Sequence, residues 1–145
     1  MHVIETSDLG KRYNEVIALD GLNLKVKEGE IFGLLGPNGA GKTTTLLMLA
    51  TLRNPTSGSA KVNGFDIVKE QSQVRNSIGV VFQDPSSDDI LTCYENLKLH
   101  CWLYAMKPEV RDKRIAEVLD IVELTSRKDD RVKKYSGGMR RRLEL

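Results

Sequence analysis

The sequence predicts an α/β fold with a β-rich N-terminal part, one strand–loop–helix unit, and a helical insertion before a terminal helix. Three observations lead to this prediction: short apolar runs bounded by turn residues, a glycine-rich octapeptide that follows one of them, and helical periodicity in the second half. A chain of 145 residues is near the common size for one core. Its net charge of +2 is too small to favour nucleic acid or a membrane surface as a partner.

No apolar run approaches the roughly 20 residues that a membrane-spanning helix needs. The first residues, MHVIETSDL, do not have the pattern of a signal peptide. Any membrane role is therefore expected to depend on a partner. Cys93 and Cys101 lie eight residues apart in an apolar helical stretch, so we expect buried free thiols, which fits a reducing cytoplasm.

The first 83 residues are expected to form strands and two helices. An apolar run that is bounded by turn residues is consistent with a strand buried on both faces. Turns are predicted at KEGE and RNPTSG, where Gly, Asn and Pro gather. The expected strands are HVIET, VIALD, LNLKV, the buried run IFGLLG (31–36), SAKVNG and the buried run IGVVF (78–82); the expected helices are GKTTTLLMLATL and EQSQVRNS.

Beyond Gln83 the pattern becomes helical. The stretch TCYENLKLHCWLYAM opens with a capping box between Thr92 and Glu95. Pro108 suits the first turn of a helix that runs to residue 124. The stretch TSRKDDRVKKY is expected to be a polar connector to the terminal helix. The apolar positions expected to give the second helix one buried face are Val110, Ile115, Val118, Leu119, Ile121 and Val122.

The octapeptide GPNGAGKT, residues 36–43, matches the phosphate-binding pattern G-x-x-x-x-G-K-[ST]. Its glycines allow successive backbone N–H groups to turn toward phosphate oxygens, and the following helix points its N-terminus at them. Lys42 is expected to reach the β- and γ-phosphates, the Thr43 hydroxyl to ligate Mg²⁺, and Thr44 to meet the α- or β-phosphate. The pattern alone does not separate kinases, GTPases and ATPases. The predicted nucleotide contacts here are Gly36, Pro37, Asn38, Gly39, Ala40, Gly41, Lys42, Thr43 and Thr44.

Three motifs in order, GPNGAGKTTT, the glutamine of VVFQD, and YSGGM, make the chain resemble ATP-binding cassette (ABC) proteins, which are P-loop NTPases. The resemblance covers essentially all 145 residues and includes RNPTSGSAKVNGFDI and LTCYENL between the motifs. The ending YSGGMRRRLEL, in place of the commoner Leu-Ser-Gly-Gly-Gln start, is similar to the drug-exporter branch of daunorubicin-resistance and nodulation-type ATPases.

The resemblance implies roles for three residues outside the loop. Tyr13 would stack on adenine, with Val16 lining the same pocket; the alternative is a half-buried strand tyrosine. Gln83 would contact Mg²⁺ or the attacking water; the alternative is an ordinary loop glutamine. Lys42, Gln83 and Ser136 are thus the expected catalytic residues, and Thr43 and Gln83 the expected metal ligands.

The resemblance also implies that Ser136, Gly137 and Gly138 bind the γ-phosphate held by a second subunit, packed head to tail. Small residues at a helix start offer N–H groups and a hydroxyl to an anion; the alternative is a simple Ser N-cap. Tyr135 and Met139 depart from the commoner signature without removing a phosphate donor. The three arginines that follow are expected on a solvated helix face or facing bound nucleotide, so no direct nucleic-acid contact is expected.

The function implied is the ATP-binding subunit of an ABC transporter, an exporter, that couples hydrolysis of Mg-ATP to transport. Its partners would be a membrane permease and a second ABC subunit, and it would lie on the cytoplasmic face of the membrane through the permease. Two alternatives stay open: a soluble ABC protein acting on nucleic acid or ribosomes, and a non-catalytic nucleotide-binding module. The expected parts are 1–83, the β-rich part and phosphate-loop core; 84–135, the helical subdomain; and 136–145, the start of the signature helix.

The resemblance further implies a buried strand ending in Asp-Glu shortly after residue 145. We therefore expect a truncated cassette that lacks these carboxylates, with an unpaired edge and exposed apolar surface beside the phosphate-loop strand. ATP hydrolysis by this chain alone is expected to be near background, because phosphoryl transfer depends on positioning and metal charge.

Overall fold

Two long antiparallel strands begin the fold in the computed structural model, which describes residues 1–145. Strands β1 (His2–Tyr13) and β2 (Val16–Lys27) pair from end to end, with Tyr13 opposite Val16 across the turn. Strands β3 (Ser57–Val62) and β4 (Phe65–Asp66) complete a four-stranded sheet in the order β2-β1-β3-β4. Every pair in this sheet is antiparallel, as expected for the N-terminal β subdomain.

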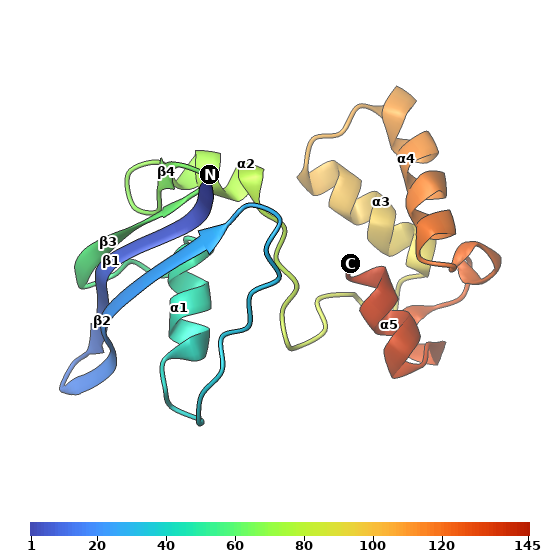
Figure 1. The fold of residues 1–145 in the computed structure, drawn as a ribbon. Helices are drawn as coiled ribbons and strands as arrows, with labels where there is room; N and C mark the ends of the chain where they lie inside the picture. The colour runs from blue at the N-terminus through green and yellow to red at the C-terminus, as the bar shows by residue number, and fades with distance from the viewer. The chain divides into compact units, whose positions relative to one another are not determined.

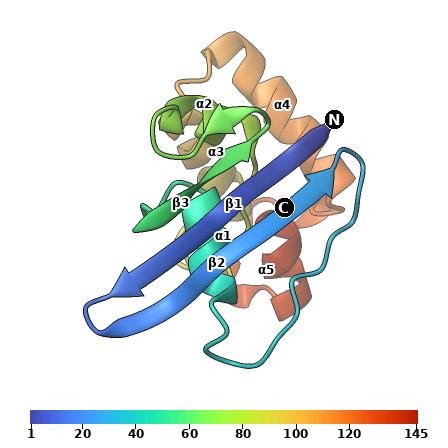
Figure 2. The same cartoon turned by 60° about the vertical axis from the view of Figure 1, so that its left-hand side comes forward.

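Helix α1 (Lys42–Leu49) packs against one face of this sheet, as Figure 2 shows behind β1 and β2. Met48 and Leu49 of α1 are buried against apolar side chains of β1 and β3, and Val74 of the short helix α2 (Gln71–Ser77) joins them. This contact gives the first part of the chain a small core around α1. Its buried members are Leu9, Met48, Leu49, Ala60, Val62, Ile67 and Val74.

The two apolar runs expected to be buried strands, 31–36 and 78–82, are not strands in the structure. Ile31 and Leu35 are almost fully exposed, and Val80 and Phe82 are nearly half exposed. A strand forms only when a neighbour takes up its N–H and C=O groups, and no strand of this chain pairs with either run. The strand prediction is therefore wrong for these residues, whereas the predicted exposed apolar surface is present.

The helical part is built from α3 (Cys93–Leu103), α4 (Pro108–Ile121) and α5 (Gly137–Leu143). Two short 3-10 turns, η1 (Thr125–Arg127) and η2 (Val132–Lys134), connect α4 to α5. The predicted start signals of both long helices are confirmed, because Thr92 and Glu95 form a capping box and Pro108 occupies the first turn of α4. The buried members of this core are Cys93, Cys101, Ile115, Leu119, Leu124 and Tyr135.

Helix α4 buries a narrower face than predicted. Ile115 and Leu119, one turn apart, are buried, whereas Val110 and Ile121 are 55% and 74% exposed. Val110 lies in the first turn of α4, and Ile121 lies off the face on which Ile115, Leu119 and Val122 follow one another at helical spacing. Both cysteines are free and buried, as expected.

The chain divides into two units, Met1–Val80 and Val81–Leu145, each with its own apolar core (Figure 1). The first holds the sheet with α1 and α2, and the second holds α3, α4 and α5. None of the helices is both long and apolar enough to span a membrane.

Candidate functional site

The phosphate loop, residues 36–43, makes a tight turn and then continues into α1. The Ala40 N–H donates to the Pro37 carbonyl at 3.2 Å, which closes the turn. Gly39 and Gly41 then take φ values of 85° and 82°, in the left-handed region. Side chains other than hydrogen are strained at these angles. The two glycines therefore allow the reversal of direction that lets the loop surround a ligand.

Gly41 also brings the loop into contact with the sheet. A Cβ at this position would lie 2.4 Å from the Ala18 carbonyl oxygen on β2 and 3.2 Å from a Leu19 methyl. Such a separation is far inside van der Waals contact, so no side chain fits between the loop and β2. The absence of a side chain at Gly41 thus attaches the start of α1 to β2 close to the hairpin end of that strand. The sequence motif predicted the glycine, but it did not predict the partner Ala18.

The start of α1 presents backbone donors without acceptors. The N–H groups of Lys42, Thr43 and Thr44 make no hydrogen bond within the chain, whereas the Thr45 N–H donates to the Gly41 carbonyl at 2.8 Å. Such unpaired N–H groups and the helix dipole favour an anion at a helix N-terminus. No acidic residue occupies the first turn of α1. The arrangement can therefore accept phosphate oxygens at three consecutive donors.

The Lys42 side chain adds a positive charge to the same place. Its ammonium donates to the Gly36 carbonyl at 2.7 Å and the Pro37 carbonyl at 2.6 Å, so it curls back over the loop. Neither partner is a carboxylate, so the positive charge is not neutralised. The Thr43 hydroxyl, one residue on, has no protein partner, unlike the Thr45 hydroxyl, which donates to the Gly41 carbonyl at 2.9 Å. An exposed, unpartnered hydroxyl beside a phosphate loop fits a ligand of Mg²⁺.

Tyr13 and Val16 lie together at the hairpin end of β1 and β2. They are paired across the turn and remain 41% and 65% exposed, and Lys11 Nζ lies 5.1 Å from the Tyr13 ring centroid. The loop meets β2 at Ala18, only two residues beyond Val16. Tyr13, Val16 and the place where Gly41 meets β2 therefore lie at the same end of the sheet.

Gln83 and the serine–glycine segment belong to the second unit, and each is described there. Gln83 is exposed in an irregular segment, and the carbonyl of its neighbour Phe82 accepts a hydrogen bond from Arg141 Nη1 at 2.7 Å. Ser136 caps α5 by accepting from the Met139 N–H at 3.2 Å. Gly137 is exposed and has open space around its Cα.

The start of α5 is anchored by Tyr135. This side chain is only 6% exposed, and its hydroxyl donates to the Arg127 carbonyl at 2.7 Å. Burial raises the pKa of the phenol far above its ordinary value, and its contact with the Cys93 thiol raises it further. The phenol therefore stays a neutral donor at any physiological pH. The exposed Ser136-Gly137-Gly138 segment is held immediately next to a fixed side chain.

Sequence reasoning missed the partners of the three consecutive arginines. Arg140 pairs with Asp89 and is only 25% exposed, and Arg141 binds the Phe82 carbonyl. Arg142 pairs with Glu123 at 3.4 Å. The alternative of a solvated helix face does not hold for the partly buried Arg140, and the alternative of charge facing bound nucleotide stays a prediction. The partners of Arg140 and Arg141 lie more than fifty residues away along the chain, so no local pattern could have identified them.

Comparison with known proteins shows the family of the chain. Residues 19–145 match the ABC transporter family, and the chain belongs to it. It is 47% identical over 142 residues to the daunorubicin/doxorubicin resistance ATP-binding protein DrrA of Streptomyces peucetius, covering 98% of this chain and 43% of that protein. It is 39% identical over 143 residues to the Nod factor export ATP-binding protein I of Cupriavidus metallidurans, covering 99% of this chain and 47% of that protein. The chain thus spans less than half the length of these relatives.

Solved structures show the same fold. The cbiO1 protein of Clostridium perfringens, part of the ABC transporter complex cbiONQ, superposes with a TM-score of 0.86 at 26% identity, over 99% of this chain and 59% of that one. A dimeric ATP-binding cassette in a post-hydrolysis state, bound to ADP and Pi, superposes with a TM-score of 0.79 at 30% identity, over 97% of this chain and 66% of that one. The predicted ABC-type α/β fold class is confirmed.

Proposed function

We propose that this chain is the nucleotide-binding part of the ATP-hydrolysing subunit of an ABC exporter. One observation supports this most strongly: the start of α1 is attached to β2 at Gly41, with three unpaired N–H groups and the Lys42 ammonium directed at the same loop. This combination suits a polyphosphate, because it supplies donors and positive charge without side-chain obstruction. The names of the relatives, which refer to drug resistance and Nod factor export, support export as the direction of transport.

In this proposal the residues of the loop bind and orient the triphosphate of ATP. The Lys42 ammonium exchanges its two carbonyl partners for β- and γ-phosphate oxygens. Thr44 contacts the α- or β-phosphate through its N–H. Mg²⁺, held by the Thr43 hydroxyl and the Gln83 amide oxygen, would supply positive charge to the β- and γ-phosphates. The Gln83 side chain also orients the attacking water, a positioning role of the kind that phosphoryl transfer requires.

The adenine would stack on Tyr13 with Val16 at its edge. The exposed ring and the exposed valine side chain at the hairpin support this role, because both are available to a ligand. An aromatic ring stacks on any base through its face, so this contact adds affinity without selecting the base edge.

The Ser136-Gly137-Gly138 segment would bind the γ-phosphate of a second ABC subunit. Its exposure and the open space at Gly137 support this, as does the dimeric ADP- and Pi-bound cassette among the similar structures. The dimer would drive a membrane permease from the cytoplasmic face of the membrane. Residues 1–83 would serve as the phosphate-loop core, 84–135 as the helical subdomain, and 136–145 as the start of the signature helix.

The test is a calorimetric titration of the 145-residue chain with Mg-ATP. Lys42→Ala should abolish binding, because it removes the only side-chain cation of the loop. Lys113→Ala is the matched control, since Lys113 is an exposed lysine on α4 without a polar partner. Binding that is equal in Lys42→Ala and in the unaltered chain would contradict the proposal, as would absence of binding in all three proteins.

Hydrolysis by the 145-residue polypeptide should stay near background in the same samples. No group of three or more acidic, histidine or cysteine side chains in the structure could hold a metal ion. The proposal therefore assigns binding and positioning of the nucleotide to the residues of this chain, and no carboxylate base. Rapid phosphate release that disappears in Lys42→Ala would show that these residues also suffice for hydrolysis.

A further inference from the structure

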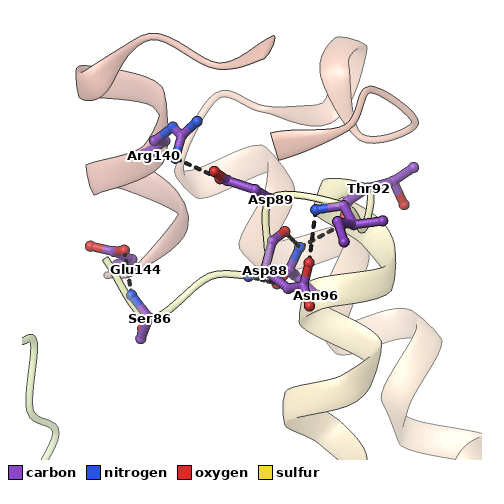
Figure 3. A network of polar contacts seen from close by, with 8 residues as sticks. Ser86, Asp88, Asp89, Thr92, Asn96, Arg140 and Glu144 are labelled. Atoms are coloured by element: carbon purple, nitrogen blue, oxygen red, sulfur yellow. Dashed lines mark hydrogen bonds and ion pairs between the residues drawn. The ribbon is translucent and has the colours of Figure 1, made fainter. Parts of the chain in front are cut away.

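Polar contacts tie helix α5 to the segment that follows Gln83 (Figure 3). Arg140 Nη1 lies 2.5 Å from Asp89 Oδ1. The Ser86 N–H donates to Glu144 Oε1 at 3.0 Å. Arg140 and Glu144 are four residues apart, so they project from the same face of α5. We call these two contacts, Arg140–Asp89 and Glu144–Ser86, the clamp.

The segment held by the clamp is fixed on its other side by α3. Asn96 is 3% exposed, accepts from the Asp88 N–H at 2.8 Å, and donates to the carbonyls of Asp88 at 3.0 Å and Thr92 at 2.9 Å. Both backbone groups of Asp88 are therefore occupied by one buried side chain, as Figure 3 shows. Residues 86–89 thus lie between two helices and are bonded to each.

Two side chains of the clamp are more buried than those of an ordinary surface ion pair. The Glu144 side chain is 6% exposed and that of Arg140 is 25% exposed, whereas that of Asp89 is 53% exposed. The exposed pair of Arg114 and Glu117 on α4 has side chains that are 55% and 45% exposed. Exposed pairs of this kind contribute little because water competes for both charges. A carboxylate as buried as Glu144 loses much of its hydration and depends on its partners.

We propose that Arg140 and Glu144 are positioning residues that transmit the position of the Gln83 segment to the phosphate-binding start of α5. This inference rests on the proposed function, in which Gln83 and Ser136-Gly137-Gly138 act on the nucleotide. Ser136 caps α5 one turn before Arg140 and two turns before Glu144, so in this proposal a displacement of residues 86–89 is passed along α5 to Ser136. The clamp thereby couples engagement of the second subunit to the segment that follows Gln83.

The experiment uses the full-length polypeptide that carries this sequence, with the variants Arg140→Gln and Glu144→Ala. Arg114→Gln is the matched control, because it removes one arginine and one exposed ion pair of the same unit. For each protein, Mg-ATP binding is measured by calorimetry and Mg-ATP-driven dimerisation by sedimentation. We expect unchanged Mg-ATP affinity in every variant, and dimerisation weakened about tenfold in the two clamp variants only, a typical size for coupling between sites.

Two further variants separate positioning from a loss of folding. Exchanging the pair, Arg140→Asp with Asp89→Arg, should restore dimerisation toward that of the unaltered protein. Glu144→Gln keeps an acceptor for Ser86 and should retain slow hydrogen exchange of the Ser86 amide, which Glu144→Ala should lose. If the exchanged pair restores nothing, the proposed positioning role is overturned, even where Arg140→Gln alone is unstable.

The outcomes distinguish the clamp from the proposed function. Normal dimerisation of Arg140→Gln and Glu144→Ala, with Mg-ATP binding intact, overturns the clamp and leaves the proposed function standing. If the unaltered protein shows no Mg-ATP binding that depends on Lys42, the proposed function is overturned. The proposed role of the clamp in nucleotide-dependent dimerisation is then overturned as well. If dimerisation is lost only in the clamp variants and the exchanged pair restores it, the result supports both the clamp and the proposed function.

Discussion

Replacement of Gly41 by alanine tests the contact between the phosphate loop and β2. The added Cβ would lie 2.4 Å from the Ala18 carbonyl oxygen, about 1 Å closer than even weak C–H···O contacts allow. An L-residue at the φ of 82° costs roughly 1–2 kcal/mol. Overpacking against a backbone atom that cannot rotate away adds about 1–3 kcal/mol. The unfolding free energy of Gly41→Ala should therefore fall by about 2–5 kcal/mol, as the sum of these two costs.

Two other glycines of the same region separate the two costs. Gly39 has a φ of 85° but no atom within 4 Å of a built Cβ, so Gly39→Ala should lose only the roughly 1–2 kcal/mol of backbone strain. Gly33 has neither a positive φ nor a close neighbour, so Gly33→Ala should be near neutral. The chain thus offers a graded series in which only Gly41 contacts β2.

The assay is urea denaturation of the four proteins without nucleotide, comparing midpoints at equal slopes. The expected order of stability is the unaltered chain and Gly33→Ala together, then Gly39→Ala, then Gly41→Ala. Equal midpoints for Gly39→Ala and Gly41→Ala would refute the close approach to Ala18. Since domains are stable by only about 5–15 kcal/mol, the largest expected loss is easily resolved.

Three further predictions concern stability and reactivity. Thr51 is a buried β-branched residue at a φ of 61°, so Thr51→Gly should raise the free energy of unfolding in urea by about 0.5–1 kcal/mol, even though it loses a hydrogen bond from Arg75; a lowered free energy of unfolding would contradict the strain. Hydrogen bonds from the backbone N–H groups of Lys69 and Val68 lower the pKa of Asp66 below the ordinary value of an aspartate. The stabilisation that this carboxylate contributes is therefore complete above the ordinary pKa and is lost as the pH falls through the lowered pKa. The free energy of unfolding, measured at a series of falling pH values, should show this loss, and the loss should be smaller in Asp66→Asn. Burial raises the pKa of the Cys93 thiol, so Cys93, which has no exposed surface, should react with iodoacetamide at neutral pH only after unfolding, as mass spectrometry would detect.

Features that depend on neighbouring residues were predictable from the sequence. The capping box of Thr92 and Glu95 and the place of Pro108 follow from side chains within one turn of each other. The glycines of the octapeptide likewise indicated a tight turn, and Gly39 and Gly41 do have positive φ values. The order of strands and helices was also predicted in outline, because each element has its own hydrophobic period.

The two apolar runs at 31–36 and 78–82 show where this reasoning fails. Apolar composition predicts that a segment seeks burial, but it does not say whether a pairing strand is available. In this chain neither run has a partner, so their side chains remain largely exposed. Strand formation is a property of a pair of segments, so a single segment predicts it poorly.

The family, the glycine-rich motif and the start signals of α3 and α4 were recognisable in the sequence alone, because they depend on residue types at short, fixed spacing. Only the tertiary structure revealed that Gly41 meets Ala18, that Arg140 pairs with Asp89, and that Glu144 holds the Ser86 backbone. These contacts join residues more than twenty, and in two cases more than fifty, positions apart. Their physical basis is close packing and charge pairing between elements, which is established only when the chain has folded.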